Sequence, residues 1–355
     1  MVDYQPVPSH YQLLTVIGKG CEEAASISLA KHLPSGTVVS IKRINLEMIE
    51  NDFNIVKTEI LMTRQLQQDN LLTYYCTFVH GKYIWCVMPL MEYGSCKDLI
   101  HAHFTEGLPE LAIAYILRDV LMALDYLHTR GIIHRSVKAS HILLSEDGRA
   151  YLGGLHYSHD MVFNGQRARK VHHFPVRAAA SLNWHSPELL EQNMNGYDTK
   201  SDIYSLGITA CELANGATPF QDLPPMQMLL EKLSGTVPRL LDANTLPETL
   251  DMEQEQGELH NDTALFQRSF TPHFHNFVHL CLQADPFQRP NAAQLLNHPY
   301  LKRAKRKSSA DNLPTLLQPV KPLSPEAILP RDSCDVEDLA EKMSEVEVEE
   351  TSWIF

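Results

Sequence analysis

The segment from His134 to Leu144 limits the possible folds of this chain more than any other stretch. It reads His-Arg-Ser-Val-Lys-Ala-Ser-His-Ile-Leu-Leu and follows the run 111–128, which is apolar around most of its circumference. A helix of that kind lies buried inside a large lobe. Further short motifs follow in order: Gly154-Leu155-His156, Trp184-His185-Ser186-Pro187-Glu188, Asp202-Ile203-Tyr204-Ser205-Leu206-Gly207 and Asp285-Pro286-Phe287-Gln288-Arg289-Pro290. So many ordered motifs are hard to obtain by chance, and together they indicate one specific fold.

The body of the chain divides into a strand-rich part and a helical part. Residues 11–90 contain β-rich runs and a single helical pattern, at 11–17, 38–44, 83–88 and 54–67. From Pro109 onward helical patterns dominate. The polar stretch 247–270 predicts a surface insertion. The sequence therefore predicts an α+β fold with a small β-rich lobe, about 11–88, and a larger helical lobe, about 92–301.

Three stretches of different composition end the chain. Basic residues fill 302–307, prolines recur up to Pro330, and residues 335–355 hold eight carboxylates and one lysine. Because proline fixes φ and removes a donor, the middle stretch predicts an extended linker. We expect the compact body to end near Leu301, with 1–10 as an N-terminal extension and 302–355 as linker and acidic tail. The basic run is either a nuclear-localisation patch or the solvated end of the last helix.

Composition excludes several classes of function. The 355 residues carry 30 Lys+Arg against 43 Asp+Glu, a net charge of −13, which disfavours nucleic-acid binding. No run approaches the roughly 20 apolar residues that a membrane span needs, and residues 1–10 lack the apolar core of a secretory signal. Seven scattered cysteines without a CxxC motif indicate free thiols in a reducing compartment.

Two features of the first lobe suit a nucleotide. Gly18-Lys19-Gly20 follows a strand-like run, and glycines let backbone amides approach phosphates closely. An ordinary β-turn is the alternative. Lys42 ends a strand-like run and Glu59 lies on the predicted helix, where the two could pair. The alternative is two solvated charges.

These motifs resemble those of protein kinases. The segment from His134 has the position of the catalytic loop H-R-D-L-x-x-x-N, and Gly154-Leu155-His156 has the position of D-F-G. Residues 11–301 resemble the bilobal kinase fold of the Ste20-like branch. The resemblance implies that Lys42 and Glu59 pair to hold nucleotide phosphates, and that Glu188 pairs with Arg289. It also implies that Asp202 caps the catalytic loop.

The sequence departs from the kinase pattern at the positions that would take up the substrate proton and bind magnesium. Ser136 replaces the catalytic aspartate, and its hydroxyl has no basic pKa near neutrality. His141 replaces the asparagine and Gly154 the aspartate that bind magnesium, a metal that prefers hard oxygen ligands. A positioned base contributes roughly 10²–10⁴ in rate, and the metal neutralises transition-state charge. The sequence therefore predicts a pseudokinase, not an enzyme.

Three longer strings, at 133–143, 165–167 and 207–216, resemble those of the STRAD pseudokinases, the Ste20-related adaptors, and are closer to the alpha form. The resemblance implies ATP binding without magnesium, at Gly18, Gly20, Lys42, Glu59, Met88 and Met91. Loop residues Arg167, Arg169, Lys170 and Arg177 either offset phosphate charge or stay solvated. The resemblance also implies two partners, a serine/threonine kinase of the liver kinase B-one type and a helical-repeat scaffold of the mouse-protein-twenty-five type. It further implies shuttling between cytoplasm and nucleus.

The last residues fit such a scaffold partner. The family ends in Trp-Glu-Phe, and this chain ends in Trp353-Ile354-Phe355, so two aromatic anchors remain while the glutamate is lost. Alternative readings stay open: a slow atypical kinase that uses the Lys42–Glu59 pair, and an adaptor that binds no nucleotide. Histidine pairs form a conceivable metal site or are ordinary surface and core residues, at His101/His103, His172/His173 and His273/His275.

Overall fold

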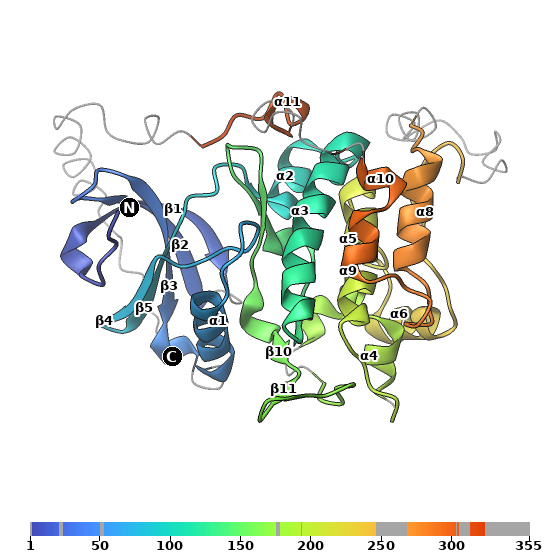
Figure 1. Cartoon of the computed structure of the whole chain (residues 1–355). Helices are drawn as coiled ribbons and strands as arrows, with labels where there is room; N and C mark the ends of the chain where they lie inside the picture. Colours follow the sequence, from blue (N-terminus) through green and yellow to red (C-terminus); the bar gives the residue numbers. More distant parts are fainter. Residues whose placement is uncertain are drawn as a thin grey trace, which may run out of the picture.

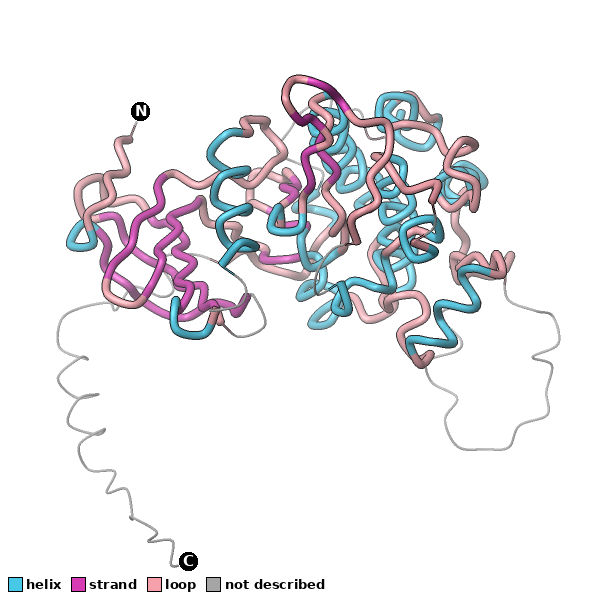
Figure 2. The backbone as a smooth tube through the Cα atoms, turned by 90° about the horizontal axis from the view of Figure 1, so that it is seen from below, coloured by secondary structure: helices cyan, strands magenta, loops and turns pink. Residues whose placement is uncertain are grey.

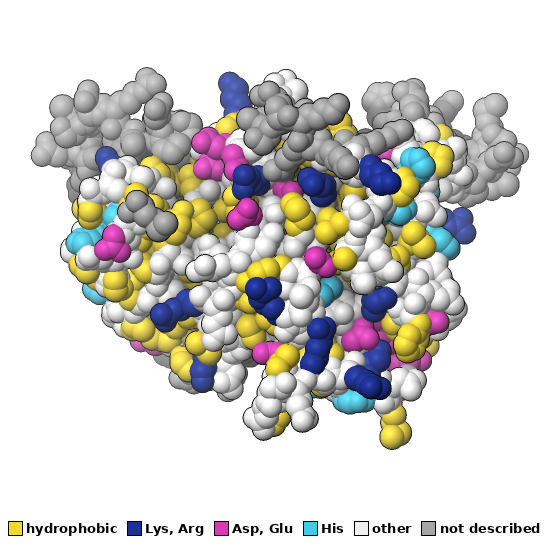
Figure 3. All heavy atoms as spheres, viewed as in Figure 1, with side chains coloured by type: hydrophobic (Ala, Val, Ile, Leu, Met, Phe, Trp, Pro, Cys, Tyr) yellow, Lys and Arg dark blue, Asp and Glu magenta, His cyan; other side chains and the backbone are white. Residues whose placement is uncertain are grey.

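The computed structural model describes residues 2–20, 24–49, 53–174, 178–192, 194–245, 268–302, 304 and 313–323. Strands gather in one lobe and helices in the other (Figures 1 and 2). This arrangement confirms the predicted α+β fold with a small β-rich lobe followed by a larger helical one. On the face shown in Figure 3, Lys and Arg side chains are spread over the larger lobe with acidic side chains between them.

The smaller lobe is a five-stranded antiparallel sheet in the order β1-β2-β3-β5-β4. Its elements are β1 (Tyr11–Gly20), β2 (Ala25–His32), β3 (Val38–Asn45), β4 (Cys76–His80), β5 (Tyr83–Met88), α1 (Phe53–Gln65) and the 3₁₀ turns Pro8–His10 and Leu46–Met48. Side chains alternate across the sheet. Ile44 and Cys86 join Val56 of α1 in one apolar cluster, while Ile41 and Trp85 belong to another. The amphipathic helix α1 therefore packs on one face of the sheet.

The larger lobe is built around α3, whose apolar circumference is buried as predicted. Its helices are α2 (Cys96–His103), α3 (Glu110–Thr129), α4 (Pro187–Glu191), α5 (Lys200–Asn215), α6 (Pro225–Leu233), α8 (Pro272–Cys281), α9 (Ala292–Leu296), α10 (Pro299–Lys302) and α11 (Leu313–Leu316). Ile113, Leu117 and Leu124 of α3 are fully buried in the main core. Gly207 of α5 lets α8 approach so closely that a Cβ there would lie 2.7 Å from Leu282.

Short strands and turns on the larger lobe carry the loops of interest. They are β6 (Gly94–Ser95), β7 (Ile132–Ile133), β8 (Ile142–Leu144), β9 (Ala150–Leu152), β10 (His159–Asp160), β11 (Val162–Phe163), β12 (Gln166–Arg167) and the 3₁₀ turns η3 (Ala139–His141), η4 (Leu155–Tyr157) and η5 (Ala178–Trp184). Strand β8 pairs with both β6 and β9. This small sheet holds the segments around His141 and Gly154 at the junction of the two lobes.

Both ends of the body pack more than the sequence predicts. Leu313 and Leu317 are buried in the main core, so residues beyond the predicted end of the body at Leu301 also pack on the larger lobe. Their i, i+4 spacing brings both side chains onto α3, although a proline lies between them. At the other end, Tyr4 stacks on Tyr75 with ring centroids 4.2 Å apart. Most of the predicted insertion 247–270, and the aromatic residues Trp353 and Phe355, lie outside the described residues.

Among the described residues, five cysteines are free thiols: Cys76, Cys86, Cys96, Cys211 and Cys281. Within the same ranges, no helix is long and apolar enough to cross a bilayer. No cluster of three or more His, Cys, Asp or Glu side chains in the described part could hold a metal ion.

Candidate nucleotide-binding and catalytic site

Lys42 and Glu59 form the buried ion pair that the sequence predicts. The Lys42 ammonium lies 2.8 and 2.9 Å from the two carboxylate oxygens of Glu59, and the Tyr74 hydroxyl donates to the same carboxylate at 2.9 Å. Burial raises the pKa of Glu59, but the Lys42 charge and these hydrogen bonds outweigh burial and lower it. Glu59 is therefore ionised at neutral pH, and it fixes the position of the lysine on β3.

The other candidate nucleotide residues surround this pair. Gly20 lies over the lysine, since a Cβ on Gly20 would come within 3.9 Å of Lys42 Cε. Gly18 pairs with Ile27 in the β1–β2 hairpin. Met88 ends β5 opposite Ser40, and the Met91 carbonyl accepts from the amide of Gly94 in the segment that joins the lobes. Their role in nucleotide binding stays a prediction.

Asp202 holds the catalytic-loop backbone from inside α5, as predicted. Its carboxylate accepts from the amides of His134 and Arg135, both at 2.8 Å, and from Nε2 of His128 at 2.8 Å. Burial raises the pKa of Asp202, and the interactions with His128 and His134 overcome that rise and lower it. These bonds hold Arg135 at φ 62°, a left-handed conformation that costs roughly 1–3 kcal/mol. The hydrogen bonds to Asp202 therefore hold the catalytic loop in a kinase-like conformation.

The loop also keeps its internal hydrogen bonds. Nε2–H of His134 donates to the carbonyl of Gly153 at 2.9 Å, and Nδ1 accepts from the amide of Ser136 at 3.2 Å. Ser136 is the residue that the sequence predicts at the position of the kinase catalytic aspartate. Its hydroxyl is buried and has no hydrogen-bond partner among the described residues. A serine hydroxyl is not basic near neutral pH, and no described group could accept its own proton in a relay. Ser136 therefore cannot take up a substrate proton.

His141 and Gly154 fit together as one unit. A Cβ on Gly154 would lie 2.4 Å from Nδ1 and 2.6 Å from Cγ of His141, and the glycine has φ +78°. Nδ1–H of His141 donates to the carbonyl of Ser136 at 2.8 Å, which locks the imidazole in that place. Gly154, which the sequence predicts at the degenerate metal position, therefore not only lacks a carboxylate; the space in which a carboxylate side chain would begin is also filled by another side chain.

Basic groups gather around this unit. The rings of His141 and His156 meet edge to face with centroids 5.2 Å apart. Burial lowers the pKa of His156 well below its usual value, and the charges of Lys42 and Lys138 lower it further. Nδ1 of His156 is buried and has no hydrogen-bond partner within the described part of the chain. His141 offers a ring nitrogen and Gly154 has no side chain, so neither supplies the oxygen ligands that Mg²⁺ prefers.

Residues 155–174, which follow Gly154, are held in place by contacts within the chain. β11 and β12 form a hairpin whose Asn164-Gly165 turn has two positive φ angles, as a type I′ turn requires. Arg167 donates to the carbonyl of His128 at the end of α3, at 2.8 Å. Nε of Arg135 in the catalytic loop donates to the carbonyl of Tyr157. The segment thus rests on α3 and on the catalytic loop.

Two further buried charges hold the larger lobe around the site. Arg289 donates to both carboxylate oxygens of Glu188 at 2.6 and 2.8 Å, which is the predicted structural ion pair. Lys232, which sequence reasoning missed, donates to the carbonyls of Leu182, Asn183 and His185. Burial lowers the pKa of Lys232 to about 7. A lysine on a helix gives no sequence signal of this role, because its acceptors are backbone atoms.

The fold and the arrangement of these residues define a protein-kinase domain. A model of the protein kinase domain matches residues 11–301. STE20-related kinase adapter protein alpha is 46% identical over 376 residues in mouse and in human, covering all of this chain and 86% of each relative. The beta form from human is 40% identical over 359 residues, covering 93% of this chain and 85% of that relative.

The chain therefore belongs to the STE20-related kinase adapter family, on the side of the alpha form. Adapter relatives and a kinase domain together support an adaptor pseudokinase. This agrees with the sequence interpretation at the level of fold and class.

Proposed function

We propose that the protein is a pseudokinase that binds ATP without magnesium and activates a partner serine/threonine kinase of the liver kinase B-one type. One observation supports this most strongly. The Lys42–Glu59 pair and the Asp202 anchor are intact, while the imidazole of His141 fills the space at Gly154. A chain that keeps the frame of a kinase and fills its metal position is suited to a function of shape rather than of phosphoryl transfer.

Nucleotide binding would use the residues that the sequence singled out. Gly18, Gly20, Met88 and Met91 would contact the nucleotide along the β1–β2 hairpin and the segment joining the lobes. Lys42, held by Glu59, would contact the phosphates, and the unpartnered buried nitrogen of His156 supplies a second polar group nearby. Bound ATP would bring an anionic polyphosphate to this basic surrounding. Magnesium does not fit, because none of Ser136, His141 and Gly154 supplies a carboxylate.

Activation of the partner would work by population shift. Docking that favours the active conformation of the partner raises its population in proportion to the difference in affinity between its two conformations. The segment on α3, held by Arg167 and by the bond from Arg135 to the carbonyl of Tyr157, supports a preformed docking face. ATP and the scaffold would favour the same closed shape of this chain, so their binding would be mutually coupled.

The scaffold would be a helical-repeat protein of the mouse-protein-twenty-five type. Trp353 and Phe355 would enter its pockets as aromatic anchors, and the preceding carboxylates would steer the tail toward a basic surface. Ile354 replaces the family glutamate, and this removes one charged contact. The basic run 302–307 would support movement between cytoplasm and nucleus.

Reconstitution tests this function directly. The full chain, the scaffold and the partner kinase are mixed, and the activity of the partner on its own substrate is measured. We expect activity above that of the partner alone. Partner activity that stays the same with and without this chain would remove the proposal.

A slow kinase is the second candidate, because the Lys42–Glu59 pair is intact. A sensitive radiometric assay compares the purified chain with Lys42→Ala, and a contaminating kinase gives equal activity in both. Activity that disappears with this substitution would favour the enzyme over the adaptor.

A further inference from the structure

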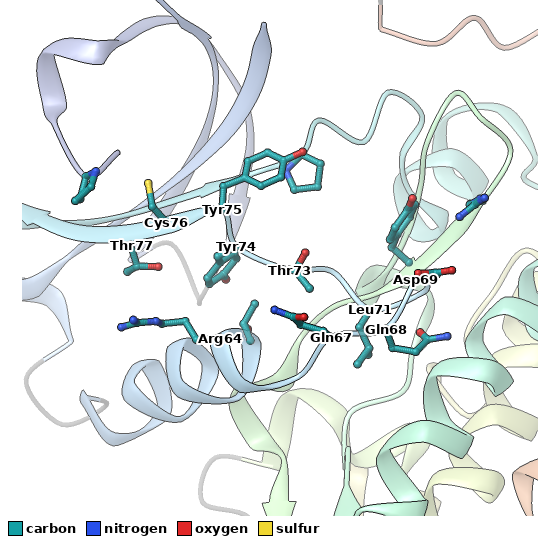
Figure 4. A pocket seen from close by; sticks show the side chains of 15 residues that line it. Arg64, Gln67, Gln68, Asp69, Leu71, Thr73, Tyr74, Tyr75, Cys76 and Thr77 are labelled. Carbon is teal, nitrogen blue, oxygen red and sulfur yellow. The ribbon is translucent and has the colours of Figure 1, made fainter. Parts of the chain in front are cut away.

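A cavity of about 820 Å³ lies between the C-terminal half of α1, the residues that lead into β4, and the β8–β9 turn (Figure 4). Lys42, Gly154 and Met91 are not among its lining residues. We call it the lateral groove, with walls that include Arg64, Tyr74, Tyr75, Pro89, Arg149 and Tyr151. Its volume is in the range of sites that hold ligands or segments of peptide.

The walls of the lateral groove combine aromatic rings with arginines. Tyr75, Tyr151 and Pro89 line the groove, and one face of the Tyr75 ring is stacked against Tyr4. Arg64 is exposed and has no ion-pair partner among the described residues, while Arg149 is 3.4 Å from Asp147. Aromatic-lined grooves bind proline-rich segments in the polyproline II conformation, and arginine pairs with carboxylates. The groove therefore suits a proline-rich segment with an acidic residue.

The chain brings such a segment to the edge of the groove. Leu323 is the last described residue, and its amide donates to the carbonyl of Glu92 at 2.8 Å. The side chain of Glu92 accepts from the amide of Glu146 in the β8–β9 turn, which leads to Arg149 in the wall. The continuation of the chain from Leu323 therefore starts beside the groove.

The sequence after this point has the right composition and period. Pro322 and Pro325 lie three residues apart, which matches the three residues per turn of the polyproline II helix, and Glu326 follows directly. Residues 324–355 are strongly acidic, which complements the arginines of the groove. A preformed polyproline II segment loses little conformational entropy on docking.

We propose that residues 324–330 dock in the lateral groove of the same molecule, with Pro325 against the tyrosines and Glu326 toward the arginines. Because the segment begins at the edge of the groove, its effective concentration there is of millimolar order, which favours it over a second copy. Residues 331–355 then leave from a fixed point on the smaller lobe. This inference does not depend on the proposed function.

Hydrogen–deuterium exchange on the full-length chain tests the docking. In a variant with residues 324–330 replaced by Gly and Ser at equal length, we expect amides of residues 67–77 to exchange about tenfold faster, which corresponds to about 1.4 kcal/mol. Arg64→Glu should accelerate exchange in 324–330 as well. Lys57→Glu, an exposed charge change on the same helix away from the groove walls, is the matched control and should leave exchange unchanged.

The outcomes separate the possible occupants. Faster exchange of residues 67–77 in the Gly/Ser variant, at every protein concentration, supports docking within one molecule. Protection that rises with protein concentration, together with a dimer in light scattering, means that a second copy fills the groove and overturns the proposal. Exchange that is identical in the parent chain, the Gly/Ser variant and Arg64→Glu overturns it too.

Discussion

Restoring the aspartate at position 154 should strongly destabilise the protein, because His141 occupies the space. A Cβ at this position would lie 2.4 Å from the imidazole, a distance at which the histidine or the backbone must move. The glycine also has φ +78°, which costs a residue with a side chain roughly 1–2 kcal/mol. Overpacking of a tight site adds about 1–3 kcal/mol. We expect Gly154→Asp to lower the free energy of unfolding by about 2–5 kcal/mol in total.

Two comparisons isolate the steric part. Gly36→Asp is the matched control, since Gly36 has φ +72° and nothing within 4 Å of an added Cβ. It should cost only the backbone part of about 1–2 kcal/mol. His141→Asn combined with Gly154→Asp should then recover about 1–3 kcal/mol relative to the sum of the single substitutions. The assay is urea unfolding followed by tryptophan fluorescence, with thermal melting as a second probe.

Two results would refute this reasoning. Gly154→Asp and Gly36→Asp could cost the same, which would mean that the imidazole moves aside freely. The double substitution could instead be purely additive, in which case His141 and Gly154 do not depend on each other.

Three further outcomes follow from the structure. Lys232→Met should lower the free energy of unfolding by about 3 kcal/mol or more, because three buried carbonyls lose their donor; a loss under 1 kcal/mol in the same urea assay would contradict the role of this lysine. Glu59 has a lowered pKa, so its contribution is present above its ordinary value of 4.5 and is lost as pH falls through the lower value in the folded state. The difference in stability between the parent chain and Glu59→Gln should therefore shrink on acidification below pH 4.5, and a difference independent of pH would refute this assignment. Replacing Trp353 and Phe355 by alanine should weaken scaffold binding at least about tenfold in titration calorimetry, whereas unchanged affinity would discard the tail as an anchor.

Contacts that depend on a particular residue type at a particular motif position could be predicted from the sequence. Lys42 and Glu59 were expected to pair because the strand lysine and the helix glutamate of the kinase pattern are adjacent in that fold. The anchoring of the catalytic loop by Asp202 was foreseen in the same way. The family pattern supplied the distances that periodicity alone does not contain.

Features that depend on how side chains fill space were not predictable. The absence of a side chain at Gly154 is visible in the sequence. That the imidazole of His141 occupies the space beside it becomes visible only when the two loops are placed in three dimensions. The burial of Leu317 beyond the expected end of the body was missed because the prolines around it indicated a linker. The i, i+4 spacing of Leu313 and Leu317 was the signal that could have revealed it.

Calorimetric titration of ATP into the purified full-length chain, once with excess magnesium and once with a chelator, tests the central claim most directly. The account predicts the same affinity in both conditions, with no heat from magnesium alone and with binding abolished in Lys42→Met. ATP affinity that is at least tenfold higher with magnesium than with the chelator would contradict the account. It would show that the site binds the metal despite Ser136, His141 and Gly154.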